Sequence, residues 1–223
     1  MLETMLKFLL DLLFPKHSLT GYEGEWITDR ERQLLRLYPI RLDKQLLRKK
    51  NIRSLDCLIA AGSYASSPLL KKAIRTFKYK RIPELGPELA SHIVKSLPGL
   101  LLLPSTMKNS EIVLCPVPLH WTRMFQRGFN QAHILAEEIG KQRQWSVLSL
   151  LKRTRSTGHQ AWRNKEERLT AVLDAFTSTT KNPPPCVLLV DDISSTGATL
   201  EACAKALKKA GVKYVAGLVI AYG

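Results

Sequence analysis

Short apolar runs bounded by polar or turn-forming residues recur from residue 58 onwards. Four of them predict β-strands, at residues 58–64, 112–116, 187–190 and 214–221. The run at 187–190 is too short for a helix, and its unbroken apolar character is typical of a parallel strand that is covered on both faces. Between the runs, apolar residues return at helical spacing. The pattern predicts an α/β domain with a mostly parallel sheet, helices on both faces, and a ligand at the carboxyl ends of the strands.

The clearest helical pattern begins at Pro68 and reaches about residue 77. Another helix is predicted over residues 88–97, and two more around Leu135 and Leu207. Residues 1–14 also have an amphipathic helical pattern, which the following proline must end. Their apolar face packs on the main domain or lies on a membrane, and we favour the first interpretation.

The chain divides into two predicted parts. Residues 1–55 comprise the first helix and a polar, strongly basic appendage, and residues 56–223 form the main domain. A length of 223 residues is enough to bury a substantial core. Hydrophobic residues make up 45% and charged residues 24%, which is typical of a globular rather than a disordered chain.

The charge is strongly positive, with 34 Lys and Arg against 19 Asp and Glu and a formal net charge of +15. This excess favours a polyanionic partner or anionic small ligands, although solubility alone is an alternative. The four cysteines lie far apart without a C-x-x-C pair, so neither a disulfide framework nor a cysteine metal cluster is expected. Residues 1–14 are too short to span a bilayer and lack a cleavage site, so we expect a cytoplasmic protein without membrane insertion.

A chemically distinctive stretch follows the strand at 187–190. Asp191 and Asp192 come first, and small or hydroxyl-bearing residues then lead into a helix. These residues are Ser194, Ser195, Thr196, Gly197, Ala198 and Thr199. Free N–H groups and the helix dipole make such an entrance an anion site, and the carboxylates suit the hydroxyls of a ribose diol. The alternatives are the first strand of a receiver domain and an ordinary buried strand with a solvated turn.

The string VLLVDDISSTGAT at 187–199 closely resembles the phosphoribosyl diphosphate (PRPP) binding motif of type I phosphoribosyltransferases. The resemblance implies that Asp191 and Asp192 contact the ribose hydroxyls and that residues 194–199 surround the 5′-phosphate, with Mg²⁺ accompanying PRPP. The sequence contains no P-loop string and no G-x-G-x-x-G dinucleotide string.

Six cations, with Phe77 and Tyr79 among them, cluster at residues 71–81. They are Lys71, Lys72, Arg75, Lys78, Lys80 and Arg81. Such a cluster suits the backbone of a nucleic acid, with an aromatic ring available for base stacking. A solvated helix face is equally consistent with these charges.

A second basic segment follows the strand at 112–116. Pro116 and Pro118 force an extended exit from this strand. Arg123 and Arg127 then precede a glycine at a helix entrance, which suits a second anionic group. The alternative is a simple loop with its arginines in water.

Three separate strings together resemble the ComF family of competence proteins: P-V-P-L-H at 116–120, R-G-F-N-Q-A at 127–132, and the stretch at 187–199. The resemblance covers roughly residues 58–223. It implies a type I phosphoribosyltransferase fold and a role in handling incoming single-stranded DNA during natural transformation, with competence helicase or recombination proteins as partners. It also implies that Arg123 and Arg127 face pyrophosphate.

The chain departs from the ComF pattern in two places. Proteins of that family usually carry an N-terminal zinc ribbon of four cysteines, and at those positions this chain has Ser18, Gly21, Thr28 and Glu31. No zinc is expected, because without thiolates this part must fold on its own packing. A family asparagine in a later loop is replaced by Ala171, which puts its contact in doubt.

Residues 150–176 are rich in cations and lack clear periodicity at their start. In type I phosphoribosyltransferases a mobile loop in this place closes over PRPP, so the resemblance implies that Arg163 and Lys165 stabilise departing pyrophosphate. Binding of DNA phosphates, or of nothing, is the alternative. His159 is a further candidate as a general acid or base, against an incidental loop histidine.

Three functions therefore stand open. The first is a ComF-like competence protein that binds PRPP or a related ribose 5-phosphate compound and contacts single-stranded DNA. The second is an active phosphoribosyltransferase that joins ribose 5-phosphate to a nitrogen base and releases pyrophosphate, although no segment for base choice is identifiable. The third is a DNA-binding module with a vestigial pocket.

Overall fold

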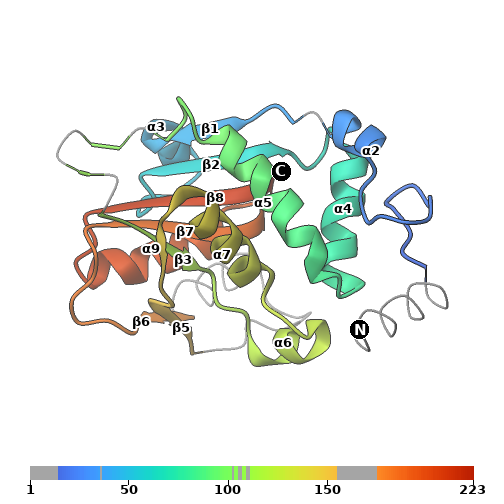
Figure 1. Cartoon of the computed structure of the whole chain (residues 1–223). Coiled ribbons are helices and arrows are strands. Elements are labelled where there is room, and N and C mark those ends of the chain that lie inside the picture. The colour runs from blue at the N-terminus through green and yellow to red at the C-terminus, as the bar shows by residue number, and fades with distance from the viewer. Residues whose placement is uncertain (1–14, 36, 102, 105–106, 109–110, 155–174) are drawn as a thin grey trace, which may run out of the picture.

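The computed structural model describes residues 15–35, 37–101, 103–104, 107–108, 111–154 and 175–223. In that part of the chain, six strands form one sheet in the order β1-β2-β8-β7-β3-β4 (Figure 1). The strands are β1 (Ile40–Asp43), β2 (Cys57–Ser63), β3 (Ile112–Pro116), β4 (Ser146–Val147), β7 (Cys186–Ser194) and β8 (Tyr214–Tyr222). A separate antiparallel ladder joins β5 (Leu151–Arg153) to β6 (Phe176–Ser178).

All neighbouring strands of the large sheet run parallel except β1, which pairs antiparallel with β2. Helices cover both faces of the sheet. They are α3 (Lys44–Lys49), α4 (Pro68–Tyr79), α5 (Gly86–Ser96), α7 (Gln131–Arg143) and α9 (Ala198–Lys209), with α2 (Asp29–Leu34), the 3₁₀ turn η1 (Pro83–Leu85) and α6 (Trp121–Arg127) further out. The predicted α/β class with a mostly parallel sheet flanked by helices is therefore confirmed.

The two faces of the sheet carry separate hydrophobic cores. Helices α4, α5 and α7 bury one face, and α3 and α9 bury the other (Figure 1). Strand β7 contributes to both, because successive side chains of a strand point to opposite faces. Leu188 and Val190 pack in the first core, and Val187 and Leu189 pack in the second. This double burial explains the unbroken apolar run at 187–190.

Local sequence signals account for the helix that carries the basic cluster. The Ser67 hydroxyl accepts a hydrogen bond of 3.2 Å from the Leu70 N–H, and Pro68 occupies the first turn of α4. The apolar residues at helical spacing are fully buried: Leu70, Ala73, Ile74 and Phe77. Helix α4 therefore begins where the sequence predicts and extends two residues beyond the predicted end, to Tyr79.

The strand predicted at 187–190 is longer than expected. Strand β7 continues through both aspartates to Ser194, four residues beyond the predicted end at residue 190. The reason lies in its neighbour, because β8 offers nine residues for pairing and the ladder continues to the pair Ser194 and Tyr222. The connecting turn is consequently short, running from Ser195 to Gly197.

Residues 40–55, which the sequence assigns to the appendage, reach the central sheet. They contribute β1 and α3, and Leu42, Leu47 and Ile52 are buried in the core beneath α9. The division of the chain near residue 55 stays a prediction. None of the described helices is both long enough and apolar enough to cross a membrane.

A buried carboxylate organises residues 16–35. Glu31 is 2% exposed and accepts hydrogen bonds from the hydroxyl of Ser18 (3.0 Å), the hydroxyl of Thr20 (2.6 Å) and the N–H groups of Thr20 and Thr28. The Thr28 hydroxyl in turn accepts from the Glu31 N–H, which completes a capping box for α2. The ComF resemblance expects zinc ligands at the positions of Ser18, Thr28 and Glu31. In this chain, hydrogen bonds to the Glu31 carboxylate connect these three positions.

Replacing Glu31 by Gln should destabilise the protein by about 2 kcal/mol or more, because the amide NH₂ would face donors that the carboxylate accepts. Burial raises the pKa of Glu31, but the hydrogen bonds from Thr20, Thr28 and Ser18 outweigh it and hold the pKa below its ordinary value. This contribution to stability is therefore present above the ordinary carboxyl pKa and is lost as the pH falls through the lowered folded-state pKa.

Urea unfolding as a function of pH measures this effect. Glu84→Gln, at an exposed position on η1, is the matched control and should leave the midpoint unchanged. Equal stability of Glu31→Gln and the wild type at neutral pH would show that the carboxylate does not organise this segment.

Candidate ribose-phosphate site

A small pocket lies at the carboxyl end of β7, where the strand turns into α9. The pocket holds about 250 Å³ of space, which includes open solvent. It is lined by Asp191, Ile193 and residues 194–200. The first N–H groups of α9 have no carbonyl partner within the helix, and the positive end of the helix dipole points the same way. The pocket therefore has the geometry of an anion site, at the edge of the sheet where the sequence predicts the ligand.

Gly197 makes this turn geometrically feasible. Its φ of +77° lies in the left-handed region that favours glycine, and it immediately precedes the first residue of α9. A Cβ at this position would also collide with the Cδ1 of Ile52, whose side chain packs against the turn. The predicted helix entrance is thus closely backed by residues from the N-terminal segment.

The hydroxyl of Ser194 is the most informative atom of the pocket. Ser194 is 4% exposed, and among the described residues its Oγ has no hydrogen-bond partner. A buried hydroxyl without a partner costs about 1–3 kcal/mol, so this group is available for a hydrogen bond to a ligand in the pocket. Ser195 and Thr196 are exposed, and Thr199 is half-buried in the first turn of α9.

The two aspartates do not face the same side of the sheet. Asp191 lines the pocket, whereas Asp192 is buried and forms a 2.8 Å ion pair with Lys78 of α4. The alternation of side chains along β7 produces this difference, since Asp192 follows Val190 on the face covered by α4. The structure thus brings Asp191, but not Asp192, to the hydroxyl-rich turn.

The environment of Asp191 favours its neutral form. Burial, and after it the charge of Asp192, raise the pKa of Asp191 to about 7. The N–H of Asp192, which donates to Asp191 Oδ1 at 2.8 Å, and the charges of Lys78 and Arg127 act in the opposite direction. The carboxyl group therefore changes its charge near neutral pH, which is typical of a functional site.

Two arginines influence this carboxyl group from different elements. Arg127, at the end of α6, donates to Gln131 Oε1 at 3.0 Å and lies 5.6 Å from the centre of the Tyr79 ring. Arg153 of β5 is half-buried, and burial followed by the charge of Arg123 lowers its pKa, while Asp191 opposes the change. The edge of the sheet around Asp191 is thus positively charged.

The six cations predicted to contact nucleic acid do not form one exposed row. Lys72, Arg75 and Lys80 are exposed, while Lys71 lies 5.5 Å from the centre of the Tyr64 ring. Lys78 is paired with Asp192, and Arg81 donates to the Gln126 carbonyl at 2.8 Å. Of the two aromatic residues in this segment, Phe77 is fully buried and Tyr79 is 68% exposed.

The contacts of two residues near this site were not predicted from the sequence. The ion pair of Lys78 went unnoticed because its partner lies far along the chain, although Lys78 borders the buried face of α4. Gln131, which is 1% exposed and holds Arg127, stands inside the R-G-F-N-Q-A string that carried the resemblance. Its place in that string is the sequence signal that could have marked it, because its burial is evident only in the fold.

Four residues named in the sequence analysis lie outside the described residues: Arg163, Lys165, His159 and Ala171. Among the described residues, no cluster of three or more His, Cys, Asp or Glu side chains forms a metal site. Mg²⁺ with PRPP therefore remains a prediction, as does the absence of zinc.

No model of a known protein family matches the chain. It is 27% identical to competence protein ComFC of Bacillus subtilis over 148 residues, and this aligned stretch is 66% of this chain and 57% of that protein. Over 116 residues it is 34% identical to competence protein F of Haemophilus influenzae, 49% of each chain. ComFC of Streptococcus pneumoniae is 35% identical over 108 residues, 48% of this chain and 47% of that protein. These similarities support the ComF family.

The match to the ComF proteins is partial. The chain spans about half the length of the curated relatives that it matches.

Proposed function

We propose that the pocket between β7 and α9 binds a ribose 5-phosphate compound, PRPP with Mg²⁺, and that the protein serves natural transformation. The observation that carries this proposal is the unpartnered, buried Ser194 hydroxyl beside a helix entrance, with the Asp191 carboxyl at the same pocket. The hydroxyl and the α9 N–H groups bind the 5′-phosphate. Ionised Asp191 accepts a hydrogen bond from a ribose hydroxyl.

The basic edge of the sheet supports a second anionic group on the same ligand. Arg127 lowers the pKa of Asp191, and Asp191 acts to raise the pKa of Arg153. Gln131 accepts a hydrogen bond from Arg127, which also lies over the Tyr79 ring. Arginines are suited to diphosphate because the guanidinium group donates two parallel hydrogen bonds. Mg²⁺ would enter with PRPP and neutralise its diphosphate.

The role in transformation is drawn from the relatives, which are named competence proteins. A protein of net charge +15 is suited to a polyanionic partner, so we include single-stranded DNA in the proposed function. PRPP then acts either as a ligand that tunes DNA binding or as a substrate.

Calorimetric titration of PRPP, ribose 5-phosphate and ribose, each with Mg²⁺, tests the pocket. The phosphorylated ligands should bind and ribose should not. Ser194→Ala should lower the affinity for ribose 5-phosphate roughly tenfold, because one hydrogen bond to a charged phosphate is lost. The same variant should be as stable as the wild type or more stable, since it removes an unsatisfied buried hydroxyl.

Ser96→Ala is the matched control for this prediction. Ser96 is also 4% exposed, but its hydroxyl donates to the His92 carbonyl at 2.8 Å, and no residue of α5 lines the pocket. This variant should lose stability and keep its affinity for ribose 5-phosphate. Unchanged affinity in Ser194→Ala would remove the phosphate assignment.

An active phosphoribosyltransferase is the second candidate. It is favoured by the electrostatic influence between Asp191 and the arginines Arg127 and Arg153, because departing pyrophosphate would need nearby positive charge. Release of pyrophosphate from PRPP in the presence of purines, pyrimidines or orotate would establish this activity. Binding of PRPP without release under every base would favour the ligand-sensing alternative.

A further inference from the structure

Helix α6 holds large apolar side chains in solvent. None of its seven residues is buried, and the exposed fractions are 74% for Trp121, 40% for Met124 and 84% for Phe125. Residues spaced by three and four positions share one face of a helix, so these three form a single patch. Leaving such side chains in water forgoes the free energy that their burial would contribute, so the patch points to an interaction surface.

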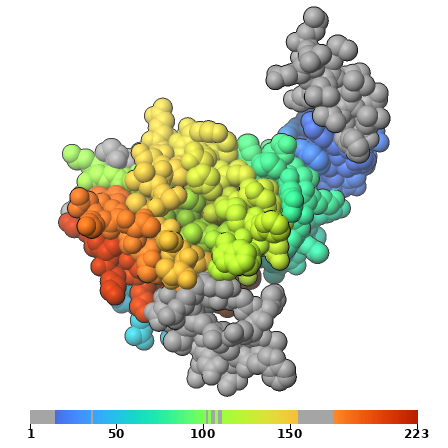
Figure 2. Space-filling view, turned by 90° about the horizontal axis from the view of Figure 1, so that it is seen from below, coloured from blue at the N-terminus to red at the C-terminus, as the bar shows by residue number. Residues whose placement is uncertain are grey.

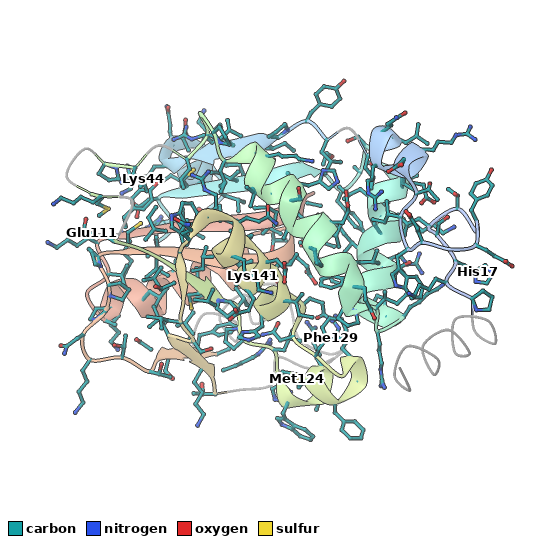
Figure 3. The ribbon with its side chains drawn as sticks, viewed as in Figure 1. His17, Lys44, Glu111, Met124, Phe129 and Lys141 are labelled. Carbon is teal, nitrogen blue, oxygen red and sulfur yellow. The ribbon has the colours of Figure 1, made fainter. Side chains whose placement is uncertain are left out.

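The end of α4 is fastened to this helix. Arg81 donates to the Gln126 carbonyl, and the rings of Phe77 and Phe129 lie 5.5 Å apart at the junction of α6 and α7, where Figure 3 labels Phe129. Tyr79, which is 68% exposed, lies under Arg127. The exposed Tyr79 ring thus belongs to the same part of the molecule as α6, whose surface is yellow-green in Figure 2.

The segments that carry α6 and Tyr79 are rich in positive charge. Residues 57–83 and 112–136 contain no aspartate and no glutamate, and Glu84 and Glu137 are the acids that follow them along the chain. Lys80 and Arg123 are exposed beside the rings. Aromatic rings that stand among cations, without a nearby acid on either segment, match a ligand with flat apolar groups and repeated negative charges.

We propose that α6, together with Tyr79, is a stacking surface for unpaired bases of a single-stranded nucleic acid, with Lys80, Arg81 and Arg123 on its phosphates. Every base has a flat face that stacks on an aromatic side chain, so such a surface binds without strong sequence preference. The proposal rests on the nucleic-acid part of the proposed function and locates it on α6 rather than along the α4 cations.

A membrane surface fits these observations less well. An interfacial helix presents a broad apolar face over many turns, whereas α6 has seven residues and is about 10 Å long. Its exposed apolar side chains are few and mostly aromatic, which suits stacking better than insertion into lipid.

Fluorescence anisotropy with two labelled oligomers of equal length separates stacking from charge attraction. One is oligo-deoxythymidine, and the other is an abasic strand with the same phosphates. The wild type should prefer oligo-deoxythymidine roughly tenfold, and Trp121→Ala/Phe125→Ala should lose that preference. Trp121→Phe/Phe125→Tyr should keep it, because both rings remain.

Tyr38→Ala is the matched control, since Tyr38 is 84% exposed and lies before β1. It should not change the preference. Arg123→Ala should reduce the salt dependence of binding by about one phosphate contact, whereas Lys209→Ala, at the end of α9, should not.

The proposal is overturned if the Trp121→Ala/Phe125→Ala protein still prefers the strand with bases. It is also overturned if that variant loses binding to anionic vesicles, or self-association in sedimentation, while the base preference stays intact. PRPP titration of the same variant separates the two proposals. Intact PRPP affinity with a lost base preference supports the stacking surface, and failure of the wild type to bind PRPP affects only the pocket.

Discussion

Replacing Lys78 by methionine should destabilise the protein by about 3–5 kcal/mol, because it leaves Asp192 as a buried carboxylate without its partner. The exposed fractions of the two side chains are 14% for Lys78 and 7% for Asp192, and their charged atoms lie 2.8 Å apart. Methionine retains the length of the lysine stem, so the loss should report the charge rather than a cavity. Urea unfolding at neutral pH measures the change.

Two further variants make this prediction specific. Lys72→Met, on the exposed face of the same helix, should change stability by less than about 0.5 kcal/mol. The double variant Lys78→Met/Asp192→Asn should recover most of the lost stability, because a buried amide is less costly than an unpaired buried charge. Stability of the single variant close to that of the wild type would show that solvent reaches Asp192 and that the ion pair is weak.

The ion pair also changes how the acidic pair is understood. Lys78 neutralises Asp192 on one face of the sheet, so Asp191 remains as the carboxyl group that lines the pocket. The two adjacent acids therefore have different surroundings, since Asp192 joins β7 to α4 and Asp191 lines the pocket. The sequence places both on the ribose, and the alternation of strand side chains is the reason for the difference.

The central strands were predictable because each signal was local. The apolar runs of β2, β3, β7 and β8 stand out in the sequence, and the inward residues of α4 follow helical spacing. The extent of β7 was not predictable from its own residues. It depends on the length of β8, which keeps Asp191 to Ser194 in the ladder.

Helix α6 escaped prediction for a different reason. It has seven residues, follows Pro116 and Pro118 closely, and its apolar side chains pack in neither core of the sheet. The hydroxyl-rich turn was located correctly by its residue types. Its surroundings, including Ile52 behind Gly197 and Arg153 near Asp191, depend on distant parts of the chain that meet only in the fold.

Replacing Asp191 by Asn should weaken ribose 5-phosphate binding about a hundredfold while stabilising the free protein near pH 8. The loss of affinity follows from one charge-assisted hydrogen bond to a ribose hydroxyl, which contributes roughly 1.5–3 kcal/mol, up to about a hundredfold in affinity. The gain in stability follows from the raised pKa of Asp191, about 7. The folded protein holds this proton more tightly than the unfolded chain, so ionisation above the unfolded-state pKa opposes folding.

The pH dependence gives the sign of each effect. Wild-type stability should fall as the pH rises from about 4 to about 7, by the contribution of this group, and Asp191→Asn should lack that part of the slope. Affinity for ribose 5-phosphate should rise with pH through about 7 in the wild type, relative to Asp191→Asn, because only the ionised carboxylate is a strong acceptor. Comparing the two proteins cancels the titration of the ligand phosphate.

Thermal unfolding and calorimetry over this pH range measure both quantities, with Asp29→Asn on α2 as an exposed control. If Asp191→Asn binds as tightly as the wild type at about pH 8, the carboxylate does not contact the sugar, and the pocket is then a phosphate site without a ribose contact from β7.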